Sequence, residues 1–194
     1  VKDVLKDWGD QKIISNIVFM GQGEPLINMK NLKTAIQILK DENGLNYGNK
    51  KITVSTSGIA NKIVEAANEI GTYLAVSLHA PNDKLREDIM PINKKFKIKE
   101  LIKQLKYYTS VVREPIFLEY VMLKDINDDL NSANQLVKIM SQFPSKVNLI
   151  EFNSWPGVKY QPTSRENIEK FSKFIQSKGY MAFIRRSRGD DVMA

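Results

Sequence analysis

The chain has 194 residues, of which 42% are hydrophobic, so it is long enough for one domain, residues 1–194, with a sizeable core. Its net charge of +7 favours polyanionic partners such as nucleic acid. It has no cysteine and one histidine, which excludes disulfides, thiolate nucleophiles, iron–sulfur ligation and a multi-histidine metal site on these residues. No apolar run approaches the roughly 18 residues of a membrane span. We therefore expect a cytoplasmic protein with no membrane partner.

Six runs rich in β-branched and aromatic residues predict strands. They cover residues 17–20, 51–56, 73–78, 116–123, 146–152 and 180–185. Between most of them, apolar residues recur at the i, i+3, i+4, i+7 spacing of amphipathic helices, and we interpret these stripes as core packing. Strand alternating with helix predicts an α/β fold with a parallel sheet, either open or curled into a barrel.

Several residues predict where helices begin and end. Ser164 is expected to cap the last helix, and Gly44, Gly71 and Gly179 are expected to mark helix ends. Residues 81–97 are expected to form an irregular connection with one short helical patch. That connection is longer than most, which often indicates function.

The turn after the first predicted strand reads Gly21-Gln22-Gly23-Glu24-Pro25. Two glycines allow a tight turn and a close approach of the backbone to a ligand. Such a turn usually suggests phosphate binding, but the carboxylate of Glu24 would repel a phosphate and attract an ammonium group. The turn therefore favours a ligand with a primary amine, and a plain turn with a solvated glutamate is the alternative.

Other strand ends also carry polar side chains, and ligands of parallel α/β folds lie at these ends. Strand alternation places Ser55 and Ser57 on one face, and it places Ser77 and His79 on one face. If these faces line a barrel mouth, hydroxyls and an imidazole meet the Glu24 turn. Such a pocket suits an amino-acid-bearing nucleoside. A structural histidine and serines that merely favour strands are the alternative.

Basic and aromatic residues near other strand ends are candidates for contact with nucleic acid. Arginines bind phosphates bidentately, and an exposed tryptophan can stack on a base. A solvated charged rim with a half-buried tryptophan is the alternative. The candidate residues are Lys94, Lys95, Trp155, Arg185, Arg186 and Arg188.

Seven ordered motifs at the strand ends together resemble one family. They read FMGQGEPLIN at 19–28, ITVSTSG at 52–58, LAVSLHA at 74–80, MPINKK at 90–95, EYVML at 119–123, KVNLI at 146–150 and RGDD at 188–191. The family is that of the radical S-adenosylmethionine (SAM) adenine-C2 methyltransferases of 23S ribosomal RNA and transfer RNA, known as RlmN. The resemblance covers nearly the whole chain from Asn16 onward.

The resemblance implies a partial, open radical-SAM (β/α) barrel of parallel strands with outer helices, lacking the first strand and the cluster loop. It implies methylation of C2 of a specific adenine by a radical SAM mechanism with a methyl-cysteine intermediate. It also implies that the methionine amine of SAM meets Gly23 and Glu24. The other residues implied for the SAM site are Ser55, Ser77, Leu78, His79 and Asn153.

The resemblance also implies parts that this chain lacks. The family holds a four-iron, four-sulfur cluster on a CxxxCxxC run that precedes the first motif, and its methyl-carrying cysteine follows the RGDD motif. We therefore expect a fragment that is inactive alone and binds SAM weakly, with the cluster present only in a longer, monomeric parent. An exposed sheet edge is expected to favour self-association of the fragment.

Two alternatives remain open at this point. One is a sister enzyme that methylates C8 of the same ribosomal adenine and confers antibiotic resistance; mapping the modified ring carbon would decide between them. The other is a non-enzymatic basic RNA-binding module. The absence of cysteine favours the module, whereas the polar strand ends disfavour it, because a pure RNA binder needs no small-molecule pocket.

Overall fold

The computed structural model describes residues 14–185. Its six strands pair in parallel in the order β1-β2-β3-β4-β5-β6, so neighbours in the chain are neighbours in the sheet. The strands are β1 (Ile17–Phe19), β2 (Ile52–Thr56), β3 (Tyr73–Ser77), β4 (Ile116–Met122), β5 (Ser145–Glu151) and β6 (Ala182–Arg185). All six predicted strands are confirmed, with small shifts at their ends.

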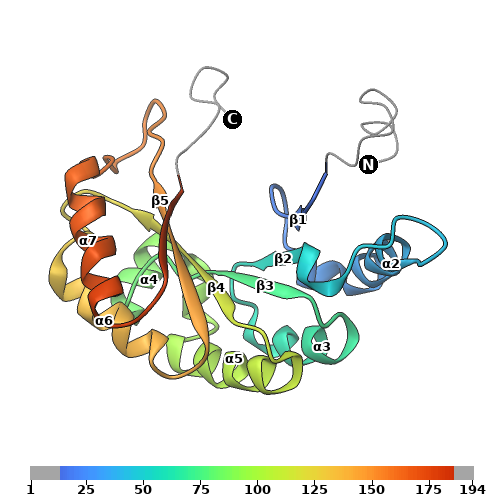
Figure 1. Ribbon diagram of the computed structural model, residues 1–194. Helices are drawn as coiled ribbons and strands as arrows, with labels where there is room; N and C mark the ends of the chain where they lie inside the picture. The colour runs from blue at the N-terminus through green and yellow to red at the C-terminus, as the bar shows by residue number, and fades with distance from the viewer. Residues whose placement is uncertain (1–13, 186–194) are drawn as a thin grey trace.

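Helices connect the strands and cover one face of the sheet. The α-helices are α2 (Met29–Lys40), α3 (Ala60–Glu69), α4 (Asp83–Ile89), α5 (Ile98–Val112), α6 (Leu130–Met140) and α7 (Arg165–Ser177). Three short 3-10 helices are η1 (Pro25–Asn28), η2 (Asn49–Lys51) and η3 (Pro91–Lys94). Figure 1 shows α2, α3, α5, α6 and α7 along the outer side of the curved sheet.

The sheet is curved but not closed. Its edges are β1 and β6, and no pairing within residues 14–185 joins the two. The structure is therefore the open α/β barrel with outer helices that the sequence and the resemblance predicted.

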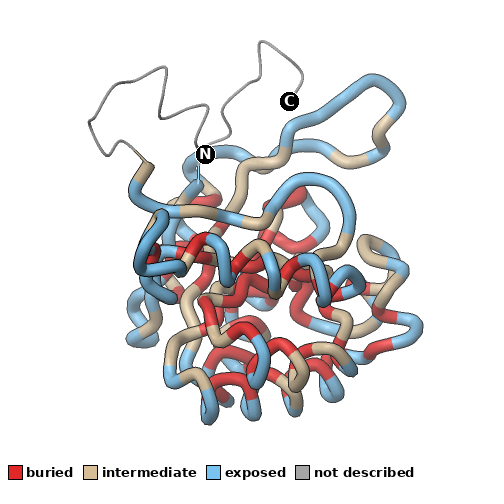
Figure 2. Tube along the Cα trace, turned by 90° about the vertical axis from the view of Figure 1, so that its right-hand side faces the viewer, coloured by how far each residue is buried: buried red, intermediate tan, exposed pale blue. Residues whose placement is uncertain are grey.

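Alternation along the strands separates an apolar outer face from a more polar inner face. Val54, Val76 and Leu118 are buried against the helices, whereas Ser55 and Ser77 point to the opposite face and remain partly exposed. Figure 2 shows the buried residues concentrated in the body of the fold. The core thus lies between sheet and helices and leaves the inner face available for polar side chains.

Most of the predicted helix ends agree with the structure. Ser164 accepts a hydrogen bond from the amide of Asn167 at 3.2 Å, as expected of a capping serine. Gly71 and Gly179 follow α3 and α7 with φ of 62° and 86°. The prediction for Gly44 is wrong, because α2 already ends at Lys40 and Gly44 belongs to the turn that follows.

The connection 81–97 is more ordered than predicted. It forms both α4 and η3 instead of a single helical patch, and it buries Arg86 and Asn93 completely. Among the residues that the structure describes, no helix combines the length and apolarity needed to cross a bilayer.

Candidate functional site

A cavity of about 440 Å³ opens where β1, β2 and β3 end. The turn from Gly21 to Pro25 forms one side of it, and Ser55, Ser57 and Ser77 contribute to the other. Its volume lies within the roughly 300–1,000 Å³ of small-molecule sites. The cavity therefore joins the acidic turn to the hydroxyl-bearing strand ends, as the sequence predicted.

Glu24 bridges the two sides of this cavity. One carboxylate oxygen, Oε2, accepts hydrogen bonds from the amide and the hydroxyl of Ser57, each at 2.7 Å. The other oxygen, Oε1, accepts one from the amide of Leu26 at 3.1 Å, which caps η1. Since a carboxylate has about four acceptor positions, Glu24 keeps one for a ligand. The side chain is thus a half-buried part of the wall and not a solvated carboxylate.

The glycines of the turn are required by the backbone conformation. Gly21 and Gly23 have φ of 130° and 80°, where other residues are strained. A Cβ built at either position would meet no atom of the described residues within 4 Å, so crowding by these residues is not the reason for glycine there.

The chain bends sharply directly after β3. The amides of Leu78 and His79 both donate to the carbonyl of Glu119, at 3.0 and 3.2 Å. The Leu78 side chain is buried in the core, so only its backbone faces the strand ends. His79 has a φ of 56°, an uncommon conformation for a non-glycine residue that is often found at functional sites.

His79 is held as a neutral donor. Its Nδ1 accepts a hydrogen bond from the amide of Val121 at 3.1 Å, so the neutral ring carries its proton on Nε2. Burial, reinforced by the nearby Arg86 charge, lowers the pKa of His79 to about 4. Asn127 supports this arrangement by donating to the carbonyls of His79 and Val121, at 2.8 and 2.7 Å.

Glu119 lies on the inner face beside the cavity, in register with Ser77 on β3 and Asn148 on β5. Its Oε1 accepts a hydrogen bond from Asn148 at 2.8 Å, and its Oε2 lies 3.5 Å from Nη1 of Arg185. Oε2 is buried, and within residues 14–185 it accepts no hydrogen bond. Burial raises the pKa of Glu119, against the opposing effects of Asn148 and Arg185.

The predicted SAM-site residues fall into two groups. Gly23, Glu24, Ser55 and Ser77 line the cavity, whereas Leu78, His79 and Asn153 do not belong to its lining. Leu78 and His79 continue directly from β3, and Asn153 follows the more distant β5.

The predicted RNA-binding residues lie at several places. Lys94 and Lys95 are exposed at η3, and Trp155 is 60% exposed in the segment that projects beyond β5 (Figure 1). Arg185 ends β6 on the inner face, beside Glu119. The remaining two, Arg186 and Arg188, lie outside the described residues.

Two buried residues that support the site were missed by the sequence analysis. Asn127 carries no local signal, because its partners are backbone groups that only the fold brings close. Arg86 stands in a charged helical segment typical of a solvated surface, yet it is fully buried behind the ends of β2 and β3.

Comparison with known proteins assigns the family. The model of the radical SAM superfamily matches residues 1–135. The chain belongs to the radical SAM superfamily. Similarity to a domain of pyruvate-formate lyase-activating enzyme from Bacteroides vulgatus supports the fold alone, with a TM-score of 0.67, 15% identity and coverage of 88% of this chain and 99% of that one.

Closer similarity is to radical SAM methyltransferases. The chain is 50% identical to the dual-specificity RNA methyltransferase RlmN of Sinorhizobium fredii over 93% of its own length and 44% of that protein. It is 42% identical to RlmN of Rhodopseudomonas palustris over 100% and 50%. A radical SAM methyltransferase from Sphaerobacter thermophilus superposes with a TM-score of 0.90 and 35% identity, over 98% of this chain and 55% of that one. The chain spans about half the length of the curated relatives it matches.

Proposed function

We propose that this chain is part of a radical SAM RNA methyltransferase, and that the cavity beside Glu24 binds the amino-acid end of SAM. The observation that carries the proposal is the turn fixed by Glu24 and Ser57, because it sets a carboxylate and exposed backbone at a cavity of small-molecule size. Similarity to enzymes named as RNA methyltransferases supports the reaction class.

The cavity fits the chemistry of SAM. The negative charge of Glu24 and the backbone at Gly23 favour an ammonium group. Ser55 and Ser77 offer hydroxyls to the sugar, and these four residues line one cavity. The proposed set also includes the Nε2 proton of His79 and the backbone of Leu78, which follow β3, and the side chain of Asn153, which follows the more distant β5.

The chain does not fit a four-iron, four-sulfur cluster by itself. Such clusters are held by cysteine thiolates, and these 194 residues contain no cysteine. In a protein that holds such a cluster, it would supply the electron for reductive cleavage of SAM. The proposal therefore assigns the cluster ligands and the methyl-carrying cysteine to residues outside this sequence.

The proposed substrate is C2 of a specific adenine in 23S ribosomal RNA and transfer RNA, and these substrates imply a cytoplasmic protein. The net charge of +7 supports a polyanionic partner. Trp155 offers an exposed ring whose centroid lies 5.5 Å from that of Phe152, and the two rings pack in a tilted arrangement. We assign phosphate contacts to Lys94, Lys95, Arg185, Arg186 and Arg188.

The experiment that tests this function uses the full-length protein with its cluster reconstituted. A 23S ribosomal RNA fragment is incubated with SAM, and the modified ring carbon is mapped by mass spectrometry. We expect a methyl group at adenine C2 with the wild type and greatly reduced methylation with Glu24→Gln. Methylation at C8 would favour the sister enzyme, and RNA binding without any methylation would overturn the proposal.

A further inference from the structure

We propose that Arg86 is the positioning residue of this site, a buried guanidinium that sets the spacing between the ends of β2 and β3 and thereby the shape of the cavity. The inference rests on the proposed function only for the identity of the ligand. Within residues 14–185, the guanidinium of Arg86 donates no hydrogen bond to a carboxylate. Arg86 is also not among the residues that line the cavity.

The guanidinium joins two strand ends directly. Its Nη2 donates to the carbonyl of Ser57, after β2, at 2.8 Å and to that of Ser77, at the end of β3, at 2.9 Å. Its Nε donates to the carbonyl of Leu78 at 3.1 Å. Because the five donors of arginine have a fixed planar arrangement, these three oxygens are held at set positions relative to one another.

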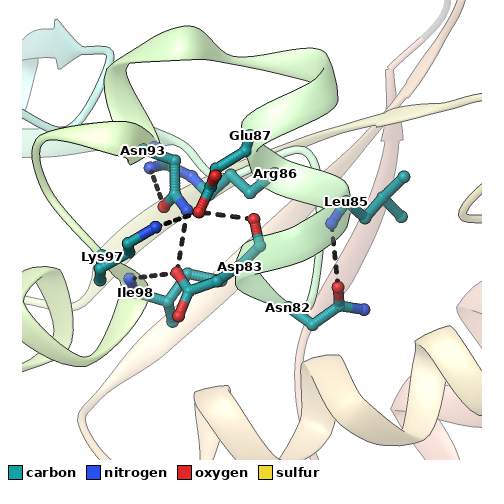
Figure 3. A network of polar contacts seen from close by, with 8 residues as sticks. All are labelled: Asn82, Asp83, Leu85, Arg86, Glu87, Asn93, Lys97 and Ile98. Carbon is teal, nitrogen blue, oxygen red and sulfur yellow. Dashed lines mark hydrogen bonds and ion pairs between the residues drawn. The ribbon is translucent and has the colours of Figure 1, made fainter.

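A second set of contacts fixes the guanidinium itself (Figure 3). Nη1 donates to Oδ1 of Asn93 at 2.9 Å, and Nδ2 of Asn93 donates to Oδ1 of Asp83 at 2.9 Å. The same Asp83 oxygen accepts a hydrogen bond from the amide of Ile98, at the start of α5, at 2.8 Å. The orientation of Arg86 is therefore set by α4, η3 and α5 together.

The neighbouring backbone makes room for this group. A Cβ at Gly58 would lie 2.9 Å from Nη2 of Arg86 and 3.4 Å from Cδ2 of Leu101. The φ of Gly58 is 98°, which also favours glycine. Gly58 directly follows Ser57, so the space for the guanidinium and the position of the cavity wall are set at adjacent residues.

Ser57 transmits the position of Arg86 to the cavity. Its carbonyl accepts from Arg86, while its amide and hydroxyl donate to Glu24. A continuous series of hydrogen bonds therefore links Arg86, in the buried connection, through Ser57 to Glu24 in the turn after β1. Burying the charged guanidinium of Arg86 costs free energy that a neutral side chain would not cost. This cost supports a geometric role for Arg86.

The test compares SAM binding by the wild type and three variants of the full-length protein. We expect Arg86→Met to weaken SAM binding by about tenfold or more, because small misplacements of a site have large effects. Arg86→Lys keeps the charge but not the planar fork, and we expect it to bind SAM nearly as weakly. The control is Tyr108→Phe, which removes a buried 2.6 Å hydrogen bond to the carbonyl of Thr72 at the opposite end of β3.

The control separates positioning from stability. Each variant is first melted, and binding is measured at a temperature where all are folded. Tyr108→Phe is expected to lower the melting temperature and leave affinity within about twofold of the wild type, because distant sites act independently. Wild-type affinity in Arg86→Met, or full rescue by Arg86→Lys, would overturn the inference.

Gly58→Ala, a further variant, tests the same contact while leaving the guanidinium in place. Its methyl group is expected to displace Nη2 and to weaken SAM binding, and adding it to Arg86→Met should cost less than the sum of the two changes. Additive effects would contradict the inference.

If the wild type itself fails to bind SAM, the proposed function fails. The inference is then decided by NMR: the amide resonances of Ser57 and Leu78 must shift in Arg86→Met and not in Tyr108→Phe.

Discussion

Ser57 donates both its amide and its hydroxyl to a single oxygen of Glu24, and so ties the turn after β1 to the end of β2. The two residues lie 33 positions apart in the sequence. These two hydrogen bonds give the carboxylate a structural role in addition to its charge. Glu24 is at once the negative group at the cavity and the joint that fixes the cavity's shape, so its loss affects both binding and local stability.

The first prediction concerns this joint. Ser57→Ala removes a hydroxyl that donates to a charged acceptor, a contact worth about 1.5–3 kcal/mol. We expect the free energy of unfolding, measured by urea denaturation, to fall by about that amount. Ser55→Ala is the matched control, because Ser55 lines the same cavity and the change should cost little. Equal losses in the two variants would contradict the role given to Ser57.

The fold could be predicted from the sequence because its signals are local. The alternation in Ile52–Thr56 and the helical stripe in Ile98–Val112 each report burial within one element. Parallel pairing then follows from the order of strands and helices. The open edges followed from the family resemblance and not from periodicity.

The site could be predicted only in part, for a physical reason. The glycines and the glutamate of the turn stand next to one another in the sequence, which is why Gly23 and Glu24 could be predicted. The structure gives Gly23 a positive φ. Arg86 was missed because its acceptors are backbone carbonyls at the ends of two strands, and no residue type marks a carbonyl as a partner. Asn127 was missed for the same reason.

The second prediction concerns His79, the single histidine of the chain. With its pKa lowered to about 4 from 6.5, the folded state binds fewer protons than the unfolded state between these values. Stability should therefore be full above pH 6.5 and decline on acidification towards pH 4, by at most about 1.4 kcal/mol per pH unit. NMR titration of the imidazole should give a midpoint near 4. A midpoint near the ordinary value would show that the ring is solvated.

The third prediction concerns Glu119, whose pKa burial raises. The folded carboxyl holds its proton more tightly than the unfolded one, so its contribution to stability is largest below the ordinary pKa and is lost as the pH rises through the raised value. Glu119→Gln removes this titration. We expect the wild type to lose stability relative to Glu119→Gln as the pH is raised above the ordinary carboxyl value, as measured by urea denaturation. The opposite trend would show that the ion pair with Arg185 dominates.

The fourth prediction concerns Trp155. An exposed ring that stacks on a base contributes about 1–3 kcal/mol, so Trp155→Ala should weaken binding to a ribosomal RNA fragment about 5- to 150-fold with little effect on stability. Trp155→Phe should retain much of the affinity. Met181→Ala is the control, since Met181 is 56% exposed just before β6. Comparable RNA affinity in Trp155→Ala and Met181→Ala would remove Trp155 from the RNA surface.

The central claim is that the cavity beside Glu24 receives the amino-acid end of SAM, and chemical-shift mapping tests it most directly. The isotope-labelled 194-residue chain is titrated with SAM, at concentrations suited to weak binding. We predict shifts of the Gly21, Gly23 and Ser57 amides that saturate with SAM and are lost in Glu24→Gln. Shifts confined to other surfaces, or saturating shifts that persist unchanged in Glu24→Gln, would contradict the account.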